Sequence, residues 1–141
     1  MVGIRKSGLT IERIDSELLV FDPETDEVHS LNESSALVFD MCDGSSTTEE
    51  MRARLPEIGL PADPEIIELA LAELDEASLI EVQPALAASN VTRRTLTRRL
   101  GLSAVAVALI PVVETILAQP AAAAGSFLTT PAGTSGTTAA P

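Results

Sequence analysis

Three short segments near the N-terminus limit the fold that this chain can adopt. Residues 9–14 (LTIERI), 18–21 (LLVF) and 27–31 (EVHSL) are rich in β-branched and large apolar side chains. Turn-forming residues separate them, Asp15-Ser16 after the first segment and 22–26 (DPETD) after the second. This pattern predicts three antiparallel strands in a meander.

Helical spacing and helix caps follow the strands. We expect Ser34-Ser35 to cap a first helix. Thr47 and Glu50 have the spacing of a capping box, which opens a second helix. Asp63-Pro64 is an N-cap followed by proline at the first helical position, and it opens a third helix. Residues 79–82 (LIEV) can add a last short strand. Three strands followed by three helices predict a small α+β domain over residues 1–83.

The charge of the chain is divided unevenly. The formal net charge is −12, and all 21 acidic residues except Glu114 lie in residues 1–91. The front of the chain therefore repels the phosphate backbone, whose neutralisation supplies most non-specific affinity for nucleic acids. We expect no nucleic-acid partner.

The chain lacks the residues of a recognisable active or metal site. Cys42 is the only cysteine and His29 the only histidine, so an internal disulfide is impossible and a structural zinc site lacks ligands. Cys42 is expected to be a small buried hydrophobe. Phosphate-binding glycine loops and Ser/His/Asp arrangements are absent from the sequence. We therefore expect a protein that is not an enzyme, with no catalytic residues, no metal and no cofactor.

Residues 28–55 contain a series of short motifs, namely His29-x-Leu31-Asn32, the helix start at Ser35-Ala36, the Cys42-Asp43-Gly44 turn and Thr48-x-Glu50. In this order and spacing they resemble the PqqD family of peptide chaperones. Downstream, 67–82 resembles the closing helix of the family and its Leu-Ile-Glu end. The resemblance covers about residues 8–83, and it departs from the family at Phe39, where many members carry Trp.

The resemblance implies a winged helix-turn-helix-like fold and a role in peptide recognition. Members of the family bind the leader of a ribosomally made precursor peptide (a RiPP) and present it to a modifying enzyme, often a radical S-adenosylmethionine protein. The founding member serves pyrroloquinoline quinone biosynthesis. In such domains the leader adds a strand beside the third strand and packs against the third helix.

The same two elements of this chain form the candidate peptide-binding groove. If residues 27–31 are an edge strand, their unpaired backbone groups can accept an extended peptide, and the apolar border of the third helix forms the opposite wall. The candidate peptide-binding residues are Glu27, Val28, His29, Ser30 and Leu31 on the strand and Ile66, Leu69, Ala70 and Glu73 on the helix.

The C-terminal part of the sequence resembles an export signal in an unexpected place. Residues 84–91 are predicted to be a linker and 125–141 a disordered tail. Between them, 92–124 contains paired arginines, an apolar run over 100–118 and a small-residue cluster, which are features of a twin-arginine signal. We expect residues 92–124 to form an apolar helix.

Three interpretations of that helix remain open. It can anchor the protein in a membrane through 100–118, although Glu114 is costly in a bilayer. It can dock on the same protein or on a partner enzyme. The tail can also be a substrate for modification or a recognition tag. The domain is expected in the cytoplasm and, with an anchor, at the inner face of the membrane.

Two other functions compete with that of a peptide chaperone. A membrane-tethered scaffold for a modifying enzyme would lack affinity for a leader peptide. A winged-helix transcriptional regulator would need a basic recognition helix, and none of the three helices predicted for residues 1–83 carries a basic cluster.

Overall fold

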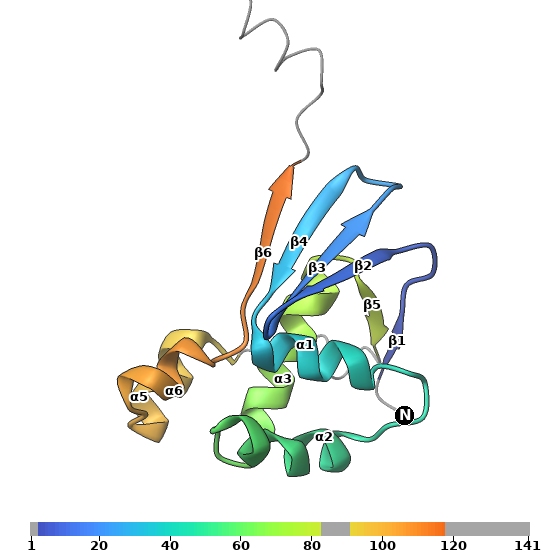
Figure 1. Cartoon of the computed structure of the whole chain (residues 1–141). Coiled ribbons are helices and arrows are strands. Elements are labelled where there is room, and N and C mark those ends of the chain that lie inside the picture. Colours follow the sequence, from blue (N-terminus) through green and yellow to red (C-terminus); the bar gives the residue numbers. More distant parts are fainter. Residues whose placement is uncertain (1–2, 83–90, 118–141) are drawn as a thin grey trace, which may run out of the picture.

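The computed structural model describes residues 3–82 and 91–117, with the side chain of Leu117 excepted (Figure 1). Two antiparallel sheets and several helices make up this part of the chain. The expected α+β class is therefore confirmed. The predicted linker falls almost wholly outside the described residues, and the predicted disordered tail falls wholly outside them.

The larger sheet contains the predicted meander. Strands β2 (Thr10–Ile14), β3 (Glu17–Asp22) and β4 (Glu27–Leu31) pair in sequence order and antiparallel. Asp15 and Asp26 sit in the two connections with φ of 55° and 60°, a left-handed conformation that Asp tolerates better than most residues. The expected three-stranded count is wrong, because a fourth strand, β6 (Val113–Leu117), pairs with β4.

A second, two-stranded sheet joins the beginning and end of the front domain. Its strands are β1 (Gly3–Arg5) and β5 (Ile80–Val82), which pair antiparallel. The prediction of a last short strand is confirmed by β5, whereas β1 was not predicted. The close approach of the two strands favours glycine at position 3, since an added Cβ would lie 3.1 Å from the carbonyl oxygen of Glu81, a tight contact.

The helices of the domain begin where their caps place them. Helix α2 (Thr48–Arg54) opens with the predicted capping box, and η1 (Leu55–Ile58) follows it. Helix α3 (Pro64–Glu76) is capped by Asp63 with proline in its first turn, as predicted. Helix α1 (Glu33–Met41) departs from the prediction, because its N-cap is Asn32. Ser34 and Ser35 lie inside its first turn and are buried.

The core lies between the inner face of the larger sheet and helices α1, α2 and α3. Its largest fully buried side chain is Phe39, the aromatic anchor of this core. Cys42 is buried as expected, and burial raises the pKa of its thiol to about 12. The C-terminal segment contributes to the same core through Leu96 and Ile110, each 0% exposed.

The predicted apolar helix over 92–124 is wrong for the residues described. Helix α5 (Arg93–Leu100) ends at Gly101, whose φ of 57° suits a left-handed helix stop. Helix α6 (Ala104–Ala108) is short, Pro111 follows it, and the chain continues as β6. Among residues 3–82 and 91–117, no helix is long and apolar enough to cross a membrane. The membrane anchor expected over 100–118 thus has no support in this part of the chain.

Candidate peptide-binding groove

The outer edge of β4, the expected peptide-binding edge, is paired with β6 of the same chain. Figure 1 shows β6 alongside β4, at the side of the sheet opposite β2. The register is antiparallel over five residues, from Glu27 opposite Leu117 to Leu31 opposite Val113. Residues 27–31 are therefore not a free edge in this structure.

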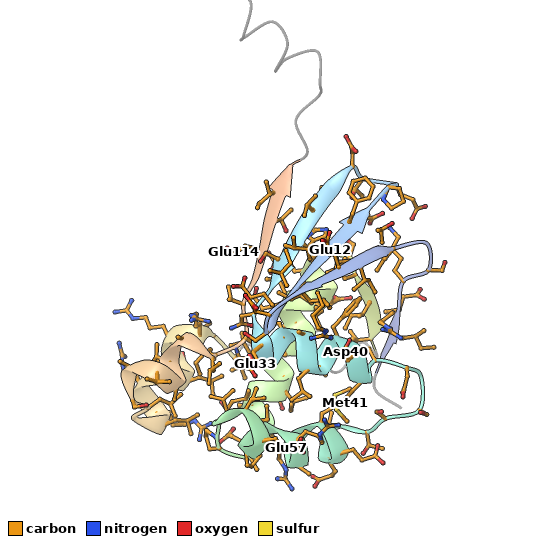
Figure 2. All side chains as sticks on the ribbon, viewed as in Figure 1. Glu12, Glu33, Asp40, Met41, Glu57 and Glu114 are labelled. Atoms are coloured by element: carbon orange, nitrogen blue, oxygen red, sulfur yellow. The ribbon has the colours of Figure 1, made fainter. Side chains whose placement is uncertain are left out.

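Side chains alternate along both strands of this pair. On β4, His29 and Leu31 are buried, whereas Val28 and Ser30 are only partly buried. His29 lies opposite Thr115, and Leu31 opposite Val113, so these four residues share the inner face. Glu114, labelled in Figure 2, and Ile116 belong to the outer face and are exposed.

One backbone hydrogen bond next to the β4–β6 pair shows which residues of the two strands are hydrogen-bonded to each other. The N–H of Asn32 donates to the carbonyl of Val112 at 3.4 Å. In an antiparallel ladder this makes Leu31–Val113 a pair without mutual hydrogen bonds, and the pattern then alternates. The N–H groups of Val28, Ser30, Glu114 and Ile116 consequently point across the β4–β6 pair, while those of Thr115 and Leu117 point away from β4.

The helix residues predicted for the groove separate into two groups. Ile66, Leu69 and Ala70 are 0–4% exposed and belong to the core. Glu73 reaches β6, where its carboxylate accepts a hydrogen bond from the N–H of Val113 at 3.4 Å. Burial raises the pKa of Glu73 above its usual range. A role for any of these residues in binding a separate peptide stays a prediction.

A cavity remains between the end of α3 and β6. Its volume is about 240 Å³, and it is lined by Glu73, Glu76 and Ala77 from the helix side and by Val113 and Thr115 from β6. The inner side chains of β6 therefore leave space beside α3 unfilled. Glu76 and Ala77 were missed in the sequence, although both continue the helix face that contains Glu73.

His29 makes the side-chain contact between β4 and β6. Its Nδ1 lies 2.9 Å from the Thr115 hydroxyl, and its Nε2 lies 3.8 Å from a carboxylate oxygen of Glu27. The Glu27 carboxylate favours the tautomer with the proton on Nε2, which leaves Nδ1 to accept from Thr115. Within the described residues, Nε2 has no hydrogen-bond partner. Burial lowers the pKa of His29, against the opposing attraction of Glu27 and Asp22.

Three polar residues at the start of α1 hold the chain just before β6; we call Asn32, Ser34 and Ser35 the α1 clamp. The amide nitrogen of Asn32 donates to the carbonyls of Ile110 at 2.8 Å and Ala108 at 3.3 Å. Its amide oxygen caps α1 and also accepts from the N–H of Val112 at 3.2 Å. The serine hydroxyls donate to the carbonyls of Leu109 and Val112.

Arg93, the first arginine of the signal-like pair, binds the same segment. Its guanidinium donates to the carbonyls of Val107 at 3.0 Å, Ile110 at 2.5 Å and Pro111 at 3.3 Å. Arg99 meanwhile joins α5 to the start of α3 through both carboxylate oxygens of Asp63, each at 3.0 Å. These contacts were not predicted, because their partners are distant in sequence and are mainly backbone carbonyls.

The comparison with protein families addresses the same part of the chain. Residues 17–80 match the family model described as coenzyme PQQ synthesis protein D (PqqD). This part of the chain is PqqD-like. The match spans β3, β4 and the three helices, and therefore includes both walls of the groove. Neither a curated protein nor a solved structure matches the chain.

The lowered pKa of His29 predicts a pH dependence of stability. A buried neutral histidine binds protons less readily than the same residue in the unfolded chain, so the free energy of unfolding should fall as the pH drops below about 6.5. Urea unfolding at pH 7.5, 6.5 and 5.5 measures this. Glu73 contributes with the opposite sign, because its raised pKa favours the folded state at lower pH. The difference between wild type and His29→Gln isolates the histidine, and an identical pH dependence in both would contradict the prediction.

A single substitution should separate the two roles of Asn32. Asn32→Asp keeps an oxygen that caps α1, since Asp and Asn cap about equally well. It replaces the donating NH2, however, with an oxygen that faces the carbonyls of Ala108 and Ile110. We expect loss of about 1–3 kcal/mol in the free energy of unfolding and release of the segment that leads into β6.

Two measurements check this prediction, amide exchange over 106–117 and urea unfolding. Exchange in that segment should accelerate while α1 keeps its protection. Glu33→Asp in the neighbouring position, whose side chain makes none of the clamp bonds described above, serves as the control. Unchanged exchange over 106–117 in Asn32→Asp would show that the α1 clamp does not hold the segment.

Proposed function

We propose that the PqqD-like domain is a non-catalytic peptide chaperone, which binds the leader of a ribosomally made precursor and presents it to a modifying enzyme. The family match supports involvement in the synthesis of PQQ or of other peptide-derived products. The observation that carries the proposal is the β4 edge, which receives an extended five-residue strand in continuous antiparallel register. Backbone pairing of this kind binds a peptide largely independently of its sequence.

The chemistry of the groove supports binding better than catalysis. The thiol of Cys42 is buried and has a raised pKa, which opposes a role as nucleophile. His29 is also buried, and its ring is directed to a strand–strand contact with Thr115. Selectivity would come from the alternate inner positions of the added strand, which lie beside His29, Leu31 and Glu73.

A titration with leader peptides tests this function. The peptides have the leader sequences encoded by short precursor genes that neighbour the gene of this chain. The backbone amide signals of the full chain are followed by NMR as each peptide is added. We expect the amides of Val28, Ser30 and Glu73 to shift, and those of β5 (Ile80–Val82), in the separate sheet, to remain unchanged. Binding that leaves β4 unperturbed, or the absence of binding by any such peptide, would contradict the proposal.

A further inference from the structure

We propose that β6 is a built-in ligand of the candidate peptide-binding groove between β4 and α3. An external peptide must displace β6 to bind there. A peptide that directs a basic side chain into the cavity beside α3 binds more tightly than β6 does. This inference rests on the proposed function, because it assigns the same groove to an external peptide. Beyond that function, we infer that residues 113–117 of the chain compete with the external peptide for the groove. We also infer which side chains the external peptide carries.

The segment before β6 is held firmly, whereas the strand itself is not. Residues 107–112 are fixed by the α1 clamp and by Arg93. Ile110 is 0% exposed within the core. In β6, by contrast, Glu114, Thr115 and Ile116 are exposed, and Ile116 is 57% exposed. The strand can therefore leave the edge while its attachment remains in place.

The attachment of the preceding segment keeps β6 close to the β4 edge even when the strand is detached. A ligand tethered next to its site has a high effective concentration, so it competes strongly even when its intrinsic affinity is low. Within the described residues, two hydrogen bonds that involve side chains hold β6 in addition to the β4 backbone, those of Thr115 with His29 and of Val113 with Glu73. A state with β6 detached is therefore a minor state of the chain, and an external peptide binds through that state.

The strand β6 does not fill the groove completely. Val113 and Thr115 are its inner side chains, and they leave the cavity of about 240 Å³ beside them. Two carboxylates, those of Glu73 and Glu76, line that cavity. An arginine or lysine in the position of Val113 can lay its aliphatic stem along the groove and place its charge near these carboxylates. A hydroxyl two residues later retains the bond to Nδ1 of His29.

The test uses the peptide IPVVETILA, which has the sequence of residues 110–118, as a separate ligand. It is titrated into the full chain and into Ile116→Pro, in which proline removes an N–H that points to β4. The matched control is Leu117→Pro, because the N–H of Leu117 points away from β4. We expect Ile116→Pro to bind the peptide about 10- to 1000-fold more tightly than wild type and Leu117→Pro do.

Peptide variants test the side-chain pattern on the Ile116→Pro chain. Replacing Thr by Val at the position of Thr115 should weaken binding roughly 2- to 12-fold, which is the effect of one lost hydrogen bond. Replacing Val by Arg at the position of Val113 should tighten binding, and the gain should shrink as salt is added. Arginine at the position of Ile116 adds the same charge on the outer face and should give no comparable gain.

The outcomes separate this inference from the proposed function. Equal affinity of wild type and Ile116→Pro for the peptide would overturn the inference, as would equal gains from the inner and outer arginines. If leader peptides bind at β4 while IPVVETILA does not, the inference falls and the proposed function stands. If neither binds to a folded Ile116→Pro chain, both fall.

Hydrogen exchange in the wild-type chain tests the pairing without relying on the folding of a variant. We expect the amides of Val28 and Ser30 to be protected by β6. Rapid exchange of both amides would show that β6 does not cover the edge of β4, and would overturn the inference.

Discussion

The side-chain amide of Asn32 joins three parts of the molecule, namely the end of β4, the start of α1 and the segment that leads into β6. Its oxygen caps α1 and accepts from the N–H of Val112, while its nitrogen donates to the carbonyls of Ala108 and Ile110. An irregular segment in the protein interior needs such partners, because buried backbone groups without hydrogen bonds are costly. This attachment places β6 at the edge of β4. The strand thereby occupies the same edge that the proposed leader peptide would use.

The export-like pattern near the C-terminus has a structural explanation in the described residues. Arg93 holds three backbone carbonyls, and Arg99 forms an ion pair with Asp63 at the start of α3. The apolar residues between them and β6 contribute Ile110 to the core. Of the interpretations of the tail, docking on the same protein therefore describes residues 93–117, though as two short helices and a strand.

Local signals in the sequence predicted the front domain well. The turns at Asp15 and Asp26, the capping box at Thr47 and the cap at Asp63 act over a few residues, and each appears in the structure where it was expected. Serine is a good cap, so the sequence alone favours Ser34-Ser35 as the first cap, but the carbonyls that these serines bind come from Leu109 and Val112. Long-range contacts of this kind leave no local pattern. For the same reason the β4–β6 pairing was not predicted, and the edge of β4 that was expected to be free is occupied by β6.

The peptide-like role of β6 requires that this strand lies antiparallel to β4 with His29 opposite Thr115. In an antiparallel pair without mutual hydrogen bonds, the two residues face each other at a Cα–Cα distance of about 4.5 Å, and their α protons are close. A nuclear Overhauser spectrum of the full chain therefore tests the central claim directly. The account predicts cross-peaks between the α protons of His29 and Thr115, and between those of Leu31 and Val113. Assigned spectra that lack both cross-peaks, with random-coil shifts for residues 113–117, would contradict it.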